Sequence, residues 1–202
     1  MRDAVGKRSG GEDMAAEQIE FVPVKMVLPD LLQAPVFSLP SEYEARTFRP
    51  GDERVWAEIE TAAGEFASEG EARDRFEREF GDRREEVDKR CFFIGTGGRV
   101  IGTAMGWYGT GVEGGIAGRV HWVGIHPGFQ GRGLGRPLVS LAVECLKRYH
   151  ESAYLTTQTT SARGVKVYLD FGFRPVVGGD EEKKGWRILA ETLGDPRLDA
   201  YW

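Results

Sequence analysis

Hydrophobic residues recur every three or four positions over residues 52–66, which is the spacing of a helix with one buried face. Asp52 stands where an N-cap residue is expected. Residues 69–90 are mostly charged, and both signs are interleaved around a narrow stripe of Ala and Phe. This mixture predicts a helical segment with a solvent-facing side. Ahead of both helices, residues 43–48 predict a short strand.

From residue 91 onward the hydrophobic positions form short β-rich runs that are separated by turn residues. The elements predicted there are strands at 91–95, 100–108, 119–126, 153–159, 173–177 and 186–191, and helices at 134–150 and 162–171. A tight hairpin joins the first two of these strands. Strands that come first in succession and then alternate with helices predict an α/β protein, in which helices cover the faces of a mixed sheet.

The first 40 residues follow neither period. Residues 1–19 are polar, Gly-rich and aperiodic, which predicts a disordered tail. Residues 20–40 are apolar but hold four prolines, and prolines at this density forbid a regular helix. Because several Val, Leu and Phe side chains in this segment favour burial, we predict an extended arm. It would pack on a single domain formed by residues 41–202.

Composition narrows the classes of function. The chain has 202 residues, of which 27 are basic and 32 acidic, so its net charge is −5. No positive excess is available for a nucleic-acid backbone. No apolar run is long enough to span a membrane, and the N-terminal region has no stretch typical of a signal peptide. Cys91 and Cys145 lack metal-ligand and CxxC spacing. We therefore expect a cytoplasmic protein without a metal, which binds neither nucleic acid nor membranes.

A glycine-rich turn between a predicted strand and a predicted helix carries the candidate chemistry. Three glycines within residues 131–135 let the backbone approach a ligand closely. The first amides of the helix have no partner within it, and they lie at the positive end of the helix dipole, where they can bind an anion. Pro137 fits a first helical turn, and Arg132 and Arg136 add positive charge. The turn therefore predicts a ligand that carries phosphate.

Two common nucleotide-binding motifs do not fit this turn. A P-loop needs Lys followed by Ser or Thr after its glycines, and neither pair follows here. A Rossmann fingerprint needs a different glycine spacing and an acidic residue at the end of the next strand. This chain has Thr156, Thr157 and Gln158 at that place. A turn that only connects a strand to a helix is the remaining alternative.

Two stretches resemble motifs of the GNAT superfamily, the acyl-CoA-dependent N-acetyltransferases. Gln130-Gly-Arg-Gly133-Leu-Gly135 matches the family's coenzyme-A-binding pattern. The second stretch, Tyr168-Leu-Asp-Phe-Gly172-Phe173, matches a signature in which a tyrosine near the end of a helix precedes a Gly-Phe turn. The order of the predicted elements is also similar. The resemblance implies a central, mixed and mostly antiparallel sheet with splayed strands and flanking helices.

The resemblance further implies that acetyl-CoA lies in a V-shaped cleft between residues 120–125 and 153–157. Backbone groups on the first strand would pair with the pantetheine arm, and the turn amides would hold the pyrophosphate. The family often has Asn seven residues before its tyrosine, where this chain has a serine. The expected cofactor-binding residues are Val123, Ile125, Gln130, Gly131, Arg132, Gly133, Leu134, Gly135, Arg136 and Ser161.

In that family's mechanism Tyr168 would be the general acid that protonates the leaving thiolate, whereas a tyrosine that only packs in the core is the alternative. His121 lies on a strand that flanks the cleft, and strict alternation would place it on one face with Val123 and Ile125. Its ordinary pKa suits a general base. A structural histidine, with Glu113 or a chain of water molecules as the base, is the alternative reading of this position.

The implied activity is transfer of acetyl from acetyl-CoA to a primary amine by direct attack in a ternary complex. Cys91 and Cys145 are expected within a strand and a helix, which disfavours an acetyl-cysteine intermediate. The alternatives are a non-catalytic domain that binds or senses acyl-CoA, and a partner-binding protein that uses residues 20–40. The acceptor, a small molecule or a peptide amine, stays open, as does the association of two chains into a homodimer.

Overall fold

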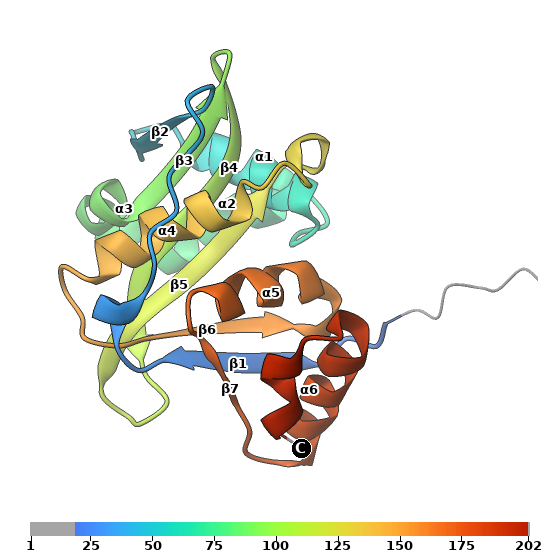
Figure 1. Ribbon diagram of the computed structural model, residues 1–202. Helices are drawn as coiled ribbons and strands as arrows, with labels where there is room; N and C mark the ends of the chain where they lie inside the picture. The colour runs from blue at the N-terminus through green and yellow to red at the C-terminus, as the bar shows by residue number, and fades with distance from the viewer. Residues whose placement is uncertain (1–18, 202) are drawn as a thin grey trace, which may run out of the picture.

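The computed structural model describes residues 19–201, which form a seven-stranded sheet with helices on both faces (Figure 1). The strands are β1 (Pro23–Leu28), β2 (Glu44–Thr47), β3 (Cys91–Thr96), β4 (Arg99–Thr110), β5 (Ile116–Ile125), β6 (Ala153–Gln158) and β7 (Arg174–Val176). The α-helices are α1 (Glu53–Ala63), α2 (Glu69–Phe80), α3 (Arg84–Arg90), α4 (Gly135–Leu146), α5 (Ala162–Asp170) and α6 (Asp180–Leu193). The tail predicted over residues 1–19 falls, except for its last residue, outside the described part of the chain.

The strands lie in the order β2-β3-β4-β5-β6-β1-β7, and β5 and β6 are the neighbours that run parallel. The other pairs are antiparallel. The mixed, mostly antiparallel sheet predicted from the sequence is therefore confirmed. Helices α4 and α5 lie in front of the sheet in Figure 1, and α1 and α2 lie behind it.

Buried side chains hold these two helical layers to the sheet. Behind it, α1 and α2 bury Trp56, Phe76 and Phe80 against β3 and β4, and all three residues are 0 % exposed. In front, α4 packs on the sheet through Leu138 and Ala142, which are also 0 % exposed. Removal of these apolar surfaces from water is the main favourable contribution to folding. Within residues 19–201, no helix combines the length and the apolar character that crossing a membrane requires.

Residues 20–40 are predicted as an extended arm lying on the domain. Their N-terminal part instead forms a strand of the sheet. Strand β1 lies inside the sheet, antiparallel to β6 along its whole length and to β7 over residues 25–27. Its alternate side chains, Val24, Met26 and Leu28, are buried. The chain then crosses α4 in Figure 1, where the amide of Phe37 donates to Ser140 Oγ at 2.9 Å. The segment is thus a central strand followed by an extended connection.

The strand predicted over residues 186–191 is wrong, because this segment belongs to helix α6. The buried residues of α6, at helical spacing, are Gly185, Trp186 and Leu189. Gly185 permits a close approach to β1, since a Cβ at this position would lie 2.7 Å from Val24 Cγ1. In the sheet, β1 lies between β6 and β7.

Candidate active site

The two parallel strands separate soon after they meet. β5 and β6 pair at Gly118 with Ala153 and at Arg119 with Tyr154, and no pairing between them continues beyond that point. Figure 1 shows the two strands diverging. The predicted splay of the sheet is therefore confirmed. It leaves backbone groups of β5 without a strand partner, and such groups favour a ligand that can hydrogen-bond to them.

Hydrogen bonding on the other side of β5 indicates which of its backbone groups face the splay. The amide of His126, directly after the strand, donates to Ile101 O at 2.8 Å, on the β4 side. Because backbone groups alternate along a strand, those of Ile125 and Val123 point the other way, toward the gap. The Ile125 carbonyl there accepts a hydrogen bond from Gln130 Nε2 at 2.9 Å. Gln130 therefore ties the glycine-rich turn to the end of β5.

A bulge in β5 changes the side on which its side chains lie. The register with β4 shifts between Thr103 and Met105, and Trp122 has a φ of +45°. His121 then turns toward α2, whereas Val123 and Ile125 pack in the clusters that include α4. The prediction that these three side chains share one face is wrong, because it assumed uninterrupted alternation.

His121 is bound to a carboxylate on α2. Its Nε2 lies 2.5 Å from Glu79 Oε1, and Trp122 Nε1 donates to Glu79 Oε2 at 3.3 Å. Burial lowers the pKa of His121 to about 4, although the hydrogen bond with Glu79 opposes this shift. Burial acts to raise the pKa of Glu79, but hydrogen bonds from His121 and Arg75 outweigh it and bring the pKa to about 2. At neutral pH the pair is a neutral imidazole that donates to a carboxylate.

The glycine-rich turn leaves several amides free, and α4 begins at Gly135 after it. Gly131 and Gly133 each have a φ of +76°, and a Cβ on either would meet nothing within 4 Å. The N–H groups of residues 131–134 have no hydrogen-bond partner in the described part of the chain. Free amides at the start of a helix fit an anion such as the diphosphate of coenzyme A.

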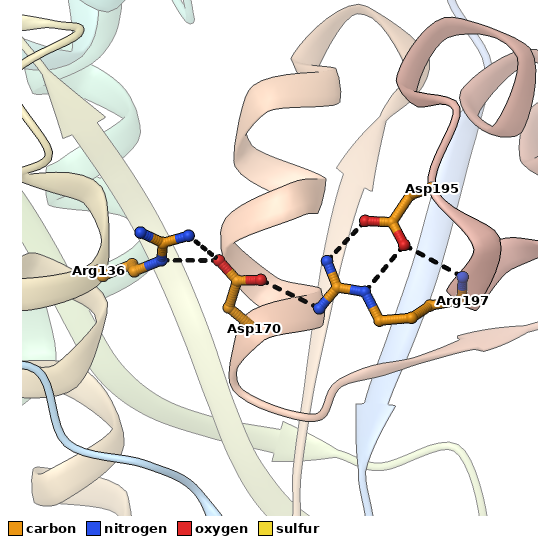
Figure 2. A network of polar contacts seen from close by, with 4 residues as sticks. All are labelled: Arg136, Asp170, Asp195 and Arg197. Carbon is orange, nitrogen blue, oxygen red and sulfur yellow. Dashed lines mark hydrogen bonds and ion pairs between the residues drawn. The ribbon is translucent and has the colours of Figure 1, made fainter.

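Figure 2 shows a series of ion pairs beside this turn. The ion pairs join α4, α5 and the C-terminal segment. Arg136 lies 2.6 Å from Asp170 Oδ2, and Arg197 lies 3.0 Å from Asp170 Oδ1. Arg197 also donates hydrogen bonds to Asp195, and these hold the pKa of Asp195 at about 2. Because Asp170 offsets its charge, Arg136 adds less positive charge to the turn than its sequence position suggests. Arg132 donates to Gly128 O at 3.0 Å.

Tyr168 is half-buried on α5, where it packs on the same cluster as Val123. Burial raises the pKa of its hydroxyl, with smaller contributions from the carboxyl groups of Glu60 and Glu65. The hydroxyl is thus protonated at neutral pH. The turn after α5 fixes this part of the helix, since the amide of Phe173 donates to Tyr168 O at 3.2 Å.

The remaining predicted groups have structural contacts. Ser161 accepts a hydrogen bond from Gln158 Nε2 at 2.9 Å, just before α5. Cys91 and Cys145 are free and buried, and burial raises the pKa of both thiols. A thiol held protonated in this way is a poor nucleophile. In the described residues, no three His, Cys, Asp or Glu side chains gather in a way that could hold a metal ion.

Sequence reasoning missed Glu60, a carboxyl group on α1 that reaches Gly124 of β5. The residue is 0 % exposed, and neither carboxylate oxygen has a hydrogen-bond partner in the described structure. Burial, with a smaller contribution from Glu65, raises its pKa well above the usual range. A signal was present, because Glu60 shares a helix face with Trp56, where an apolar residue is expected. A buried carboxyl with a raised pKa and no hydrogen-bond partner is a candidate functional group.

Comparison with known proteins agrees with this geometry. The model of the acetyltransferase (GNAT) family matches residues 53–173, which include the splay, the glycine-rich turn and Tyr168. The chain belongs to the GNAT acetyltransferase family. A mycothiol acetyltransferase from Streptomyces avermitilis is 32% identical over 140 residues, which are 67% of this chain and 44% of that protein. Another, from Streptomyces bingchenggensis, is 35% identical over 150 residues, 72% of this chain and 47% of that protein. The chain thus spans about half the length of the curated relatives it matches.

Solved structures show the same fold. A GCN5-related N-acetyltransferase from Sphaerobacter thermophilus superposes with a TM-score of 0.57 at 20% identity, over 77% of this chain and 49% of that chain. A GNAT-family acetyltransferase from Colwellia psychrerythraea gives a TM-score of 0.60 at 10% identity, over 78% of this chain and 54% of the other. The GNAT fold implied by the sequence motifs is therefore confirmed.

Proposed function

We propose that this GNAT chain transfers the acetyl group of acetyl-CoA to a primary amine by direct attack. The observation that carries the proposal is the position of the free amides of residues 131–134 directly after the strand that splays from β6. The diphosphate would bind at the turn, and the amide-rich pantetheine arm would pair with the open edge of β5. Both groups meet backbone donors and acceptors that otherwise stay unsatisfied.

The chain's own groups would then act on the thioester as follows. A backbone N–H between Val123 and Ile125 would polarise the thioester carbonyl, because it is fixed in place before charge develops on the oxygen. Tyr168 would donate the proton that the leaving sulfur needs. Its raised pKa keeps this proton on the hydroxyl at neutral pH. Both cysteines are buried, which favours direct attack over an acyl-cysteine.

The acceptor is proposed by class alone. The relatives named mycothiol acetyltransferase match about half of their length, so their name does not fix the acceptor here. We propose a primary amine, on a small molecule or a peptide, and a cytoplasmic location in keeping with the two free cysteines. The test is release of coenzyme A thiol from acetyl-CoA across a panel of amines. Amine-dependent release supports an enzyme, whereas binding of coenzyme A without release from any amine would favour a sensing domain.

Replacement of Gly133 by Val should weaken the binding of coenzyme A roughly tenfold or more, measured by calorimetry. A β-branched residue disfavours the φ of +76° that this turn requires. The conformation that presents the free amides becomes less populated, and the apparent affinity falls by the same factor. Gly128→Ala is the control, since Gly128 has no positive φ and lies outside the free amides. Equal affinity of both variants would mean that the turn does not bind the cofactor.

A further inference from the structure

Glu60 is an unusual residue for the inside of a protein. It is 0 % exposed, and both of its carboxylate oxygens lack a hydrogen-bond partner within residues 19–201. Two further polar atoms of α1, Trp56 Nε1 and Thr61 Oγ1, share this condition. Buried polar atoms nearly always have a partner, because leaving one unpaired costs stability. The unpaired carboxyl of Glu60 therefore indicates a place where a polar ligand completes the structure.

The contacts of Glu60 locate this place at the splay. Its Oε1 would lie 2.9 Å from a Cβ on Gly124, so the side chain reaches the strand where only hydrogen occupies the near side. Gly124 stands between Val123 and Ile125, whose backbone groups face the gap. Helix α1 covers the sheet from behind, whereas the glycine-rich turn leads into α4 in front (Figure 1). Glu60 thus approaches the splay from the face opposite the turn.

The charges around Glu60 are compatible with a cationic ligand. Glu65, two residues after α1, acts on the pKa of Glu60, and Glu60 in turn acts on those of Tyr168 on α5 and Cys91 on β3. All of these are acidic or neutral, and no basic side chain forms an ion pair with Glu60 in the described structure. An ammonium group would supply the missing positive charge and the missing hydrogen-bond donors.

We propose that Glu60 accepts the proton of the acceptor's ammonium group, directly or through one water molecule. This inference rests on the proposed acetyl transfer. One N–H proton passes to Glu60 before attack and later leaves to solvent. The C–N bond forms and the C–S bond breaks, while Tyr168 donates a proton to the sulfur. The proton then released by the new amide nitrogen restores the Tyr168 hydroxyl, so that protons and electron pairs balance.

His121 fits this role less well than Glu60. Its Nε2 is 2.5 Å from Glu79 Oε1, and its ring turns to α2 after the bulge instead of toward the face of Val123. Glu79 occupies Nε2 of the ring, and burial lowers the pKa of His121 to about 4, so the imidazole is a weak base. The carboxyl of Glu60 has no such partner. A raised pKa brings the titration of a carboxyl closer to neutral pH, and a general base is most effective when its pKa lies near the working pH.

The experiment compares Glu60→Gln with Glu58→Gln and His121→Asn in amine-dependent thiol release from pH 5 to 9. Glu58 is on the same helix, its side chain is 53% exposed, and it serves as the matched control. We expect Glu60→Gln to lower turnover about 100-fold or more. It should also remove the rise of activity with pH on the acidic side, without changing the affinity for coenzyme A. The other two variants should keep that rise.

A second readout does not depend on activity. Because the pKa of Glu60 is raised in the folded state, the folded chain holds a proton that the unfolded chain loses above about pH 4.5. The free energy of unfolding therefore falls as pH rises from about 4.5 through the raised pKa of Glu60, because the folded chain must then bury a charged carboxylate. The melting temperature of the wild-type chain should fall more steeply with pH than that of Glu60→Gln, which should melt at the same or a higher temperature at pH 8.

The outcomes separate the two proposals. Suppose that the wild-type chain releases thiol, and that Glu60→Gln either does so at the same rate or keeps the rise of activity with pH on the acidic side (the acidic limb). Glu60 is then not the base, and the proposed function stands. Loss of that limb in His121→Asn alone would assign the proton to His121 and overturn the inference. If no amine releases thiol from the wild-type chain, the proposed function fails, and the role of Glu60 fails with it.

Discussion

Replacement of Tyr168 by Phe should lower the turnover of acetyl transfer by about 10²- to 10⁴-fold while the affinity for coenzyme A stays the same. The hydroxyl is the one group removed, and Phe keeps the ring that packs against the hydrophobic cluster. A thiolate that leaves without a proton donor is a poorer leaving group. Single-turnover thiol release, with calorimetry for coenzyme A, measures the two quantities separately.

Tyr149→Phe is the control for this change. Tyr149 follows α4, is 50% exposed and packs its ring against Arg90, so its hydroxyl has no part in the proposed chemistry. We expect wild-type turnover for this variant. If Tyr168→Phe also turns over like the wild-type chain, its hydroxyl is not the proton donor. A loss of coenzyme A affinity in Tyr168→Phe would instead indicate that the tyrosine acts in binding.

Much of the local geometry of the candidate site could be predicted because its signals are local. The free amides after β5 follow from the glycines and from Pro137, since both act on the backbone within a few residues. The tyrosine before the Gly172 turn is equally local, because a φ of +88° at that turn favours glycine. These features depend little on what packs against them, so one sequence is enough to infer them.

The parts that were missed depend on contacts between distant segments. No local pattern shows that β1 enters the sheet between β6 and β7, although Val22, Val24, Met26 and Leu28 do alternate with other residues. The same strand explains the incorrect prediction for residues 186–191. β1 lies between β6 and β7, and the C-terminal segment, as helix α6, packs on the same cluster through Trp186 and Leu189. A tertiary partner thus decided the secondary structure.

The positions of the two candidate bases were missed for different reasons. The face of His121 depends on the bulge at Trp122, and a bulge adds one residue that a strict period of two cannot reveal. Glu60 was passed over because a single carboxyl on a helix is usually exposed. Its spacing from Trp56 did point to the buried face, and Gly124 leaves the room for it, since a Cβ there would lie 2.9 Å from Glu60 Oε1. In both cases the chemistry is set by the strand that faces the side chain.

Replacement of Met26 by Ala should lower the free energy of unfolding by about 2–5 kcal/mol, because the side chain is 0 % exposed in the cluster that joins β1 to α5 and α6. The cavity left in a central strand cannot close without moving β6 or β7, which flank it on both sides. Urea unfolding followed by circular dichroism measures this loss.

The control for this change is Leu32→Ala, a few residues after β1, where the side chain is 75% exposed and the expected change is within about 0.5 kcal/mol. Equal stability of the two variants would mean that residues 23–28 are a peripheral arm, as the prolines suggested. A large loss in Met26→Ala alone makes the strand part of the core. Since β1 is the neighbour of β6 on the side away from the splay, its pairing then also fixes one wall of the proposed cofactor cleft.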